Sequence, residues 1–155
     1  MFAIVADAVE SATVTTFTPR VGPVQVVFEV AGDDYVALIE AARMAGFETF
    51  IDLCAVDHLG REPRFDVVVN LLSTLHAKRL RVKVGVSGSD PALATITPVY
   101  PGADFYERET WDLFGIVFDG HPDLTRLLMP DEWEGHPLRK DYPVGSVPVE
   151  FKATR

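Results

Sequence analysis

Cysteine is almost absent from this chain. Among its 155 residues only Cys54 carries a thiol, so no disulfide can form within the chain and its own thiolates cannot hold an iron–sulfur cluster. A chain without disulfides is typical of a reducing compartment, and the sequence therefore predicts the cytoplasm. Cys54 lies in an apolar run at residues 50–56, which predicts a buried, unreactive thiol rather than a nucleophile.

Basic residues are also scarce. The chain has 14 Lys and Arg against 23 Asp and Glu, which gives a net charge of −9. Such a surface repels DNA and RNA, so nucleic-acid binding is disfavoured. The one concentrated basic group is Arg79, Arg81 and Lys83. It alternates with apolar residues and is therefore predicted to be the solvent-facing side of a strand.

Long apolar runs and nucleotide-binding motifs are missing too. No stretch approaches the roughly 20 apolar residues of a membrane-spanning helix, and residues 1–7 lack the basic start of a secretory signal. We therefore expect any membrane association to go through partner proteins. The glycine-rich phosphate loop, the dinucleotide motif and the serine-hydrolase elbow are absent as well. These absences favour a non-catalytic subunit.

What is present has the size and composition of one folded domain. The chain is 48% hydrophobic, enough to bury a core at this length. Alternating apolar residues predict a strand over residues 24–30. A helix should follow, capped at its start by Asp33 or Asp34 and ended by Gly46 in a left-handed conformation. The apolar residues at helical spacing are Tyr35, Leu38, Ile39 and Ala42.

Three more strands are predicted in sequence, over residues 49–59, 65–73 and 79–86. The glycine and proline within residues 60–63 indicate a hairpin between the first two. One helix followed by a run of neighbouring strands favours an α+β fold. We expect a two-layer sandwich of helices on a mixed four- to five-stranded sheet.

The composition of the chain changes after about residue 90, because eight of the eleven prolines lie from there onward. We divide the single domain into an α+β core at residues 1–100 and a helix with a long irregular arm at residues 101–155. Asp104 as N-cap with Glu107 three residues later predicts a capping box, and Gly115 predicts the helix end. Large apolar side chains in the arm argue against disorder. We expect a partner surface to order it and to complete much of its backbone hydrogen bonding.

Carboxylates are concentrated in this helix. Glu109 and Asp112 are three residues apart and share a helix face, as the general acid and base of a free-standing hydrolase would. Ion pairing is the stronger interpretation, since Arg108 and Asp112 are four residues apart. The other basic residues available for pairing are Arg126, Arg139 and Lys140.

Two histidines in the arm raise the question of a metal site. His121 and His136, with Asp123 and Asp141, carry suitable ligand types. Neither histidine has the spacing of a zinc motif, and each is followed by proline, which places both in turns or loops. We expect no metal, and we expect both imidazoles to hydrogen-bond loop carbonyl groups.

Three motifs in a fixed order carry a more specific signal. They are Glu107-Arg108-Glu109-x-x-Asp112-Leu113-Phe114-Gly115-Ile116, His121-Pro122-Asp123-Leu124-x-Arg126 and Gly135-His136-Pro137-Leu138-Arg139-Lys140-Asp141-Tyr142-Pro143. Together they closely resemble the signature of the thirty-kilodalton subunit of NADH:quinone oxidoreductase, which is respiratory complex I. The resemblance covers roughly residues 30–150. Thr125 departs from it, standing where the family usually has a basic residue.

This resemblance implies a non-catalytic scaffold subunit in the peripheral arm of a proton-pumping NADH:quinone oxidoreductase. It implies no cofactor in this chain, with flavin, iron–sulfur clusters and quinone held by partner subunits. It also implies a peripheral position on the cytoplasmic side of the cell membrane. The main partner would be the quinone-site subunit, the large one that lines the quinone cavity, with neighbouring peripheral-arm subunits beside it. The residues implied at this contact are Glu107, Arg108, Glu109, Asp112, Gly115, His121, Pro122, Arg126, Gly135, Pro137, Leu138, Arg139, Lys140, Asp141, Tyr142 and Pro143.

Three alternatives stay open at this point. A homologous subunit of an energy-converting hydrogenase, or of an oxidoreductase linked to F420 or ferredoxin, would share the fold and the arm. The sequence does not choose the electron donor, because the donor binds elsewhere in the complex. The hydrolase using Glu109 and Asp112, and a soluble adaptor unrelated to respiration, are the alternatives of other classes.

Overall fold

The computed structural model describes residues 2–20 and 24–143. Three α-helices, seven strands and two short 3-10 turns follow one another along these residues. In chain order they are α1 (Phe2–Ala8), β1 (Thr13–Phe17), β2 (Gln25–Val30), η1 (Gly32–Asp34), α2 (Tyr35–Met44), β3 (Thr49–Asp57), β4 (Phe65–Ser73), β5 (Lys78–Val86), β6 (Ala92–Ala94), η2 (Pro101–Ala103), α3 (Asp104–Phe114) and β7 (Val117–Asp119).

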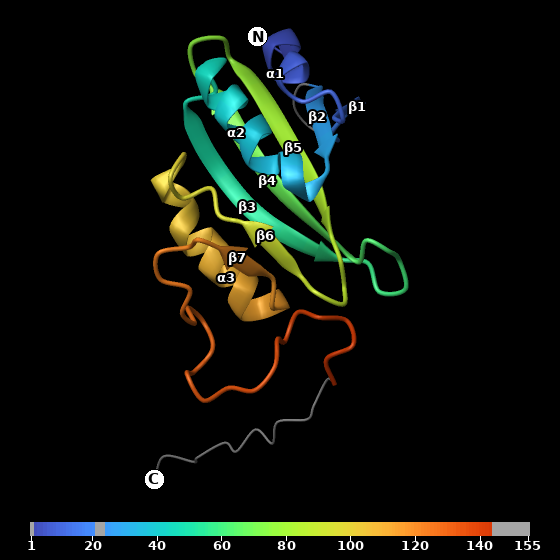
Figure 1. The fold of residues 1–155 in the computed structure, drawn as a ribbon, viewed down its shortest axis with the longest axis vertical. Helices are drawn as coiled ribbons and strands as arrows, with labels where there is room; N and C mark the ends of the chain where they lie inside the picture. Colours follow the sequence, from blue (N-terminus) through green and yellow to red (C-terminus); the bar gives the residue numbers. More distant parts are fainter. Residues whose placement is uncertain (1, 21–23, 144–155) are drawn as a thin grey trace.

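Five strands form one mixed sheet in the order β1-β2-β5-β4-β3 (Figure 1). The β2–β5 pair is parallel, and the other three pairs are antiparallel. The hairpin between β3 and β4 occurs as the sequence predicts, and β4 and β5, which follow one another closely in the chain, also pair antiparallel. The α+β class and the mixed sheet are therefore confirmed. Helix α1, strand β1 and the small parallel β6–β7 sheet were not predicted.

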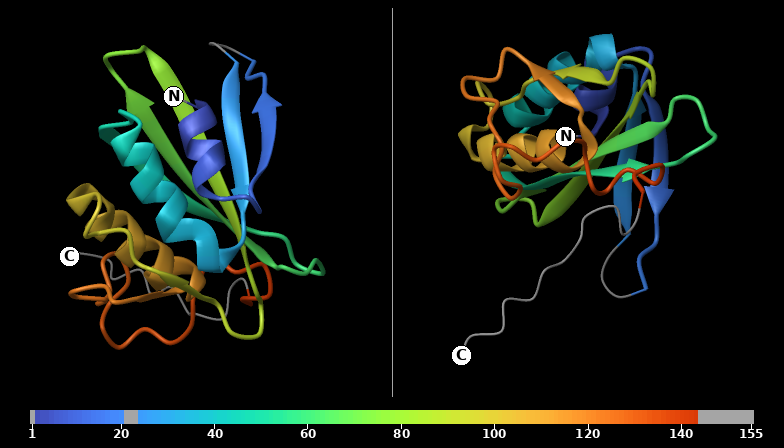
Figure 2. Two further views of the ribbon diagram at one scale, coloured as in Figure 1. Left: turned by 45° about the horizontal axis from the view of Figure 1, so that its top comes forward. Right: turned by 90° about the horizontal axis from the view of Figure 1, so that it is seen from below.

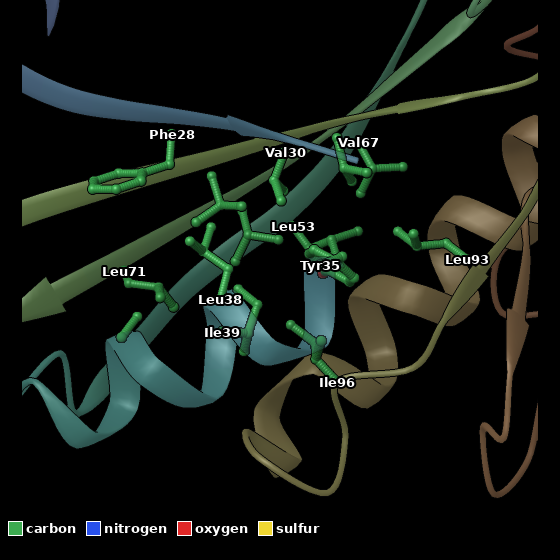
Figure 3. Close-up of a cluster of buried hydrophobic side chains, with 14 of the residues drawn as sticks. Phe28, Val30, Tyr35, Leu38, Ile39, Leu53, Val67, Leu71, Leu93 and Ile96 are labelled. Atoms are coloured by element: carbon green, nitrogen blue, oxygen red, sulfur yellow. The ribbon is translucent and has the colours of Figure 1, made fainter. Parts of the chain in front are cut away.

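The core lies between the sheet and the helices on one of its faces (Figure 2). Helix α2 presents its buried side chains at helical spacing, and β4 and β5 bury alternate residues beneath it. Figure 3 shows Phe28 and Val30 from β2 approaching Leu38 and Ile39 from α2. Burial of each such side chain contributes about 1.5–3 kcal/mol relative to exposure. This packing holds the sheet and α2 as one rigid support for the C-terminal part.

The prediction for Cys54 is wrong, because its side chain is exposed. Cys54 lies on β3, the strand at the end of the sheet. The residue before it, Leu53, is the one whose side chain is buried. Successive strand residues point to opposite faces. Cys54 therefore points away from the core. The basic group on β5 behaves as predicted, with Arg79 exposed and the side chains of Arg81 and Lys83 half-buried.

The C-terminal end of α2 is as predicted, and its N-terminal cap is not. Gly46 is left-handed with φ of +91°, as predicted. At the start, neither aspartate caps the helix through its side chain. The Asp34 carboxylate instead accepts a hydrogen bond from the hydroxyl of Ser11, which joins the α1–β1 connection to α2.

Helix α3 lies beside α2 and next to the edge strand β3 (Figures 1 and 2). Its left-handed end at Gly115, with φ of +74°, is confirmed. The predicted capping box is wrong, since Ala103 is the N-cap and makes no side-chain cap. The turn η2 leads directly into the helix, so Asp104 is already helical and Glu107 turns toward the interior.

Beyond Gly115 the described chain runs as an irregular arm to residue 143, with β7 as its one strand there. It passes below α3 and returns toward the β3–β4 hairpin (Figure 1). The irregular arm is thus confirmed over residues 117–143, and residues 144–155 of the predicted 101–155 segment lie outside the described residues. Within those described ranges, none of the helices has the length and apolarity that a membrane crossing requires.

Candidate interaction site

Glu107 joins α3 to the segment that precedes it. Its side chain is fully buried and accepts hydrogen bonds from the backbone N–H of Ile96, at 2.8 Å, and from the hydroxyl of Thr95. Burial raises the pKa of the Glu107 carboxyl, although these two donors oppose the shift. The carboxyl is enclosed and satisfied from within the chain. Its position is that of a structural anchor.

Asp112 anchors the arm to α3. One carboxylate oxygen accepts three consecutive backbone N–H groups, from Leu127 at 3.0 Å, Leu128 at 2.7 Å and Met129 at 2.9 Å. The other oxygen accepts from the Arg126 guanidinium at 2.6 Å. Burial works to raise the pKa of Asp112, but these donors lower it overall. This fully buried carboxylate fixes the course of residues 126–129.

The predicted pair between Arg108 and Asp112 is wrong, because Asp112 is saturated by the arm. Arg108 instead donates to the Thr125 hydroxyl at 3.0 Å and to the carbonyl of Arg126 at 3.2 Å. Thr125, the residue that departs from the family pattern, thus accepts a hydrogen bond at this position. A basic residue there would bring a second cation close to Arg108.

The two histidines hold the arm against α3 through backbone carbonyl groups. His136 Nδ1 donates to the carbonyl of Asp112 at 2.9 Å. His121 Nδ1 accepts from the Asp123 N–H at 3.1 Å, which leaves Nε2 as the donor, facing the Asp104 carbonyl at 3.3 Å. We expected both imidazoles to hydrogen-bond carbonyl groups of loops. The carbonyl groups that accept these bonds belong to helix α3 instead. Among the described residues no group of three His, Cys, Asp or Glu is arranged to hold a metal ion.

A second anchor lies at the far end of the arm, where the predicted residues Lys140 and Asp141 meet Arg64 and Asp57, which sequence reasoning missed. Arg64 donates two hydrogen bonds to Asp57, at 2.9 and 2.8 Å, and two to Asp141, at 2.8 and 2.7 Å. The backbone N–H of Lys140 also donates to Asp57 at 2.8 Å. Hydrogen bonding to Arg64 lowers the pKa of Asp57 to about 2. The partners lie far apart in the sequence, so no local pattern could indicate them.

The other predicted residues are half-buried or exposed at the surface of the described chain. The Arg139 guanidinium lies over the Phe65 ring at 5.2 Å, and its buried Nε has no hydrogen-bond partner within the described chain. Leu138 is 52% exposed. Glu109 is half-buried, and no hydrogen bond or ion pair from residues 2–20 or 24–143 reaches its carboxylate. Pro122, Lys140 and Asp141 are exposed, Pro137 is half-buried, and Pro143 ends the described arm.

Gly115 and Gly135 are required where aromatic rings approach the backbone. A Cβ on Gly115 would lie 2.5 Å from the imidazole of His136, and one on Gly135 would lie 2.7 Å from the ring of Tyr142. The two glycines let the arm fold closely onto itself and onto α3. Among the described residues, the chain's own carboxylates and rings make these contacts with residues 117–143, and the expectation that a partner orders the arm stays a prediction.

This geometry does not assemble an acid–base pair. Asp112 is fully buried and occupied by four donors, so it has no access to a substrate. Glu109 faces a different environment, a groove that also contains Cys54. The hydrolase hypothesis needs both Glu109 and Asp112, and Asp112 is not available as an acid or a base.

Comparison with known proteins gives the same assignment as the three motifs. A family model described as "Respiratory-chain NADH dehydrogenase, 30 Kd subunit" matches residues 28–147. A relative from Roseiflexus castenholzii, named as a subunit of NADH-quinone oxidoreductase, is 58% identical over 100 residues, which are 64% of this chain and 58% of the relative. One of the same name from Salinispora tropica is 53% identical over 107 residues, which are 68% of this chain and 44% of the relative. The chain thus spans about half the length of such relatives.

Solved structures agree. A trypsin-resistant fragment of Nqo5 is 32% identical with a TM-score of 0.64, covering 72% of this chain and 89% of the fragment. A chain of the membrane-bound sulfane sulfur reductase, an archaeal respiratory membrane complex, has a TM-score of 0.78 at 20% identity and covers 99% of this chain and 94% of its own; this second likeness shows the fold alone. With its motifs, its fold and a family match over residues 28–147, the chain belongs to the family of the 30 Kd subunit of respiratory-chain NADH dehydrogenase.

Proposed function

We propose that this chain is a non-catalytic scaffold subunit in the peripheral arm of a proton-pumping NADH:quinone oxidoreductase. It braces the large quinone-site subunit while electrons pass from NADH to quinone. The relatives from Roseiflexus and Salinispora support the choice of complex, since both are named as subunits of NADH-quinone oxidoreductase. Flavin, iron–sulfur clusters and quinone bind to partner subunits, and the chain sits peripherally on the cytoplasmic side of the membrane.

One observation carries the scaffold role. The buried acidic residues of the first motif hold the arm and α3 in place, as Asp112 does by accepting three backbone N–H groups and Arg126. A catalytic carboxyl needs access to a substrate. Arg139 and Glu109 are instead half-buried. Among the described residues, no hydrogen bond or ion pair reaches the Glu109 carboxylate, and the buried Nε of Arg139 has no hydrogen-bond partner. They are the motif residues best placed to meet another protein of the complex.

The surface of the arm fits a partner that is apolar and basic. Leu128 is 60% exposed and Leu138 is 52% exposed, and exposed leucines of this kind mark interaction surfaces when they cluster. The arm also exposes carboxylates, at Asp119, Asp123, Asp131, Glu132 and Glu134. A partner patch of positive charge would complement this side of the arm.

Replacing Arg139 or Glu109 by alanine tests the scaffold role. Removing one member of a buried charge pair costs about 3–5 kcal/mol, enough to loosen an interface. Either variant should therefore lower the amount of assembled complex in membranes, while NADH:quinone turnover per assembled complex stays nearly unchanged. Native gel electrophoresis with in-gel activity measures both quantities.

The matched controls are Arg79→Ala on β5 and Glu40→Ala on α2, since both side chains are exposed. These controls should assemble normally. Normal assembly of the Arg139 and Glu109 variants with lost turnover would contradict the scaffold role, because it would place those side chains in the reaction itself.

The alternative complex is an energy-converting hydrogenase or a related F420- or ferredoxin-linked oxidoreductase. The structural likeness to the archaeal sulfane sulfur reductase shows a shared fold and leaves the donor open. Identifying the proteins that purify together with this chain discriminates between the two complexes. A flavin and NADH module supports the proposed function, and a nickel–iron centre supports the alternative.

A further inference from the structure

A groove of about 310 Å³ runs between the edge strand β3 and helix α3. Its floor and walls include Asp52, Cys54 and Ala55 from β3 and Glu109 and Leu113 from α3. Leu138 of the arm closes one side. Consecutive residues of β3 line it, so the groove follows the edge of the strand rather than one face of the sheet.

The outer edge of β3 has no neighbouring strand in the described chain, where β3 pairs with β4 alone. Its pairing with β4 is regular from Asp52 to Asp57, after an irregularity between Phe50 and Asp52. Alternate N–H and C=O groups of such an edge point outward and can pair with another extended chain. The groove and the unpaired edge therefore coincide at β3.

The groove is acidic where it meets the edge. Glu109 is half-buried without an ion pair within residues 2–20 and 24–143. Asp52, the second carboxylate, is held by the Asn70 amide at 2.6 Å. Partial desolvation raises the pKa of the Cys54 thiol, which lines the same groove, with Asp52 and Glu109 adding to the rise and Arg81 opposing it. A cation in the groove would satisfy Glu109.

We propose that this groove receives an extended segment of a partner protein, which pairs with the edge of β3 as an added strand and places a Lys or Arg beside Glu109. Apolar side chains at alternate positions of the segment would lie against Leu113 and Leu138, as in other cases of strand addition. The inference rests on the proposed function, because the partner belongs to the assembled complex. It adds the position, backbone conformation and charge of the contacting segment.

Cys54 offers a direct probe of the groove, since it is the chain's one thiol and is exposed. A second thiol introduced by Met44→Cys, on a side chain 82% exposed at the end of α2, serves as an internal control. Both thiols are labelled with a maleimide at alkaline pH in the isolated chain and in the purified complex, and each is quantified by peptide mass spectrometry. Assembly should slow labelling at position 54 by about tenfold or more, with little change at position 44.

Changing the charge of Glu109 tests whether the partner binds at the groove. Glu109→Lys should weaken binding of the isolated chain to the complex lacking it by about tenfold or more, and Glu109→Gln by less, because only the first adds repulsion. The control Glu40→Lys makes the same change of charge on the exposed side of α2 and should bind normally.

The outcomes distinguish the two proposals. If the chain joins the complex but Cys54 labels as fast there as in isolation, the groove proposal is overturned and the scaffold role stands. The groove proposal also fails if Cys54 is already protected in the isolated chain and becomes reactive when residues 144–155 are deleted, since the chain's own tail would then be the occupant. If the chain joins no complex, both proposals fail.

Discussion

Individual carboxylates fix much of the course of the C-terminal arm. Asp57 and Asp112 accept hydrogen bonds from arm backbone and from arginine, which lowers the pKa of both, while enclosure raises the pKa of Glu107. Three buried acids thus respond to pH in two directions. Sequence reasoning placed Glu107 and Asp112 in a family motif correctly but misjudged their partners, because those partners depend on how the arm folds back.

Asp112→Ala should release residues 126–129 of the arm. It leaves three backbone N–H groups and Arg126 without their acceptor, so we expect a loss of about 3–5 kcal/mol in the free energy of unfolding. Urea unfolding measures this loss, and hydrogen exchange should quicken at Leu127, Leu128 and Met129. The control Asp131→Ala removes an exposed carboxylate of the same arm and should change stability little. Unchanged exchange at the three amides would contradict the anchoring role of Asp112.

The same residue predicts a pH dependence. The pKa of Asp112 is lower in the folded chain than in the unfolded chain, where it is about 3.9. Its contribution to stability is therefore present above that unfolded value and is lost as the pH falls through the folded value. Urea unfolding at a series of acidic pH values should accordingly show a shallower loss of stability for Asp112→Ala than for the unaltered chain.

Glu107→Gln should have the opposite pH signature. The pKa of Glu107 is raised in the folded chain, so the unaltered protein loses stability as the pH rises from the unfolded pKa, about 4.3, through the folded value. Glutamine does not titrate. The variant's free energy of unfolding relative to the unaltered chain should therefore increase with pH across that window and then level off. Urea unfolding at a series of pH values measures it, and a difference that stays constant would contradict the assignment.

At the scale of elements, strong local patterns were predicted well and weak ones were missed. Strand β4 has the predicted bounds of residues 65–73, because alternating apolar residues are buried on it. Strand β1 is exposed along its whole length, and β6 and β7 have only three residues each, too few for an alternation to stand out in the sequence. The start of α3 was misjudged because the turn η2 runs directly into it.

Gly115→Ala tests how α3 and the arm are joined. Gly60→Ala is the matched control, since Gly60 has φ of +87° with nothing near its added Cβ, while a Cβ on Gly115 meets His136. A left-handed alanine alone costs about 1–2 kcal/mol, and displacing a packed side chain adds about 1–3 kcal/mol. Thermal or urea unfolding should show the larger loss for Gly115→Ala. Adding His136→Ala should recover part of the difference, and equal losses in the two glycine variants would show that the His136 contact is unimportant.

Across the whole molecule, the sequence was sufficient for fold class and family but not for the course of the arm. Motif order led to a family that the comparisons show, whereas the anchor of Arg64 on Asp57 and Asp141 joins residues from distant parts of the chain. Local periodicity carries no information about such contacts. These contacts tie residues 117–143 to the rest of the described chain.

The central claim is that this chain works as one part of a larger respiratory complex. Native mass spectrometry of the affinity-tagged chain, recovered with mild detergent from the membranes of its own cells, tests this most directly. We predict that it is found with the quinone-site subunit and with the proteins of a flavin and NADH module. Recovery of the chain alone, or only from the soluble fraction, would contradict the account.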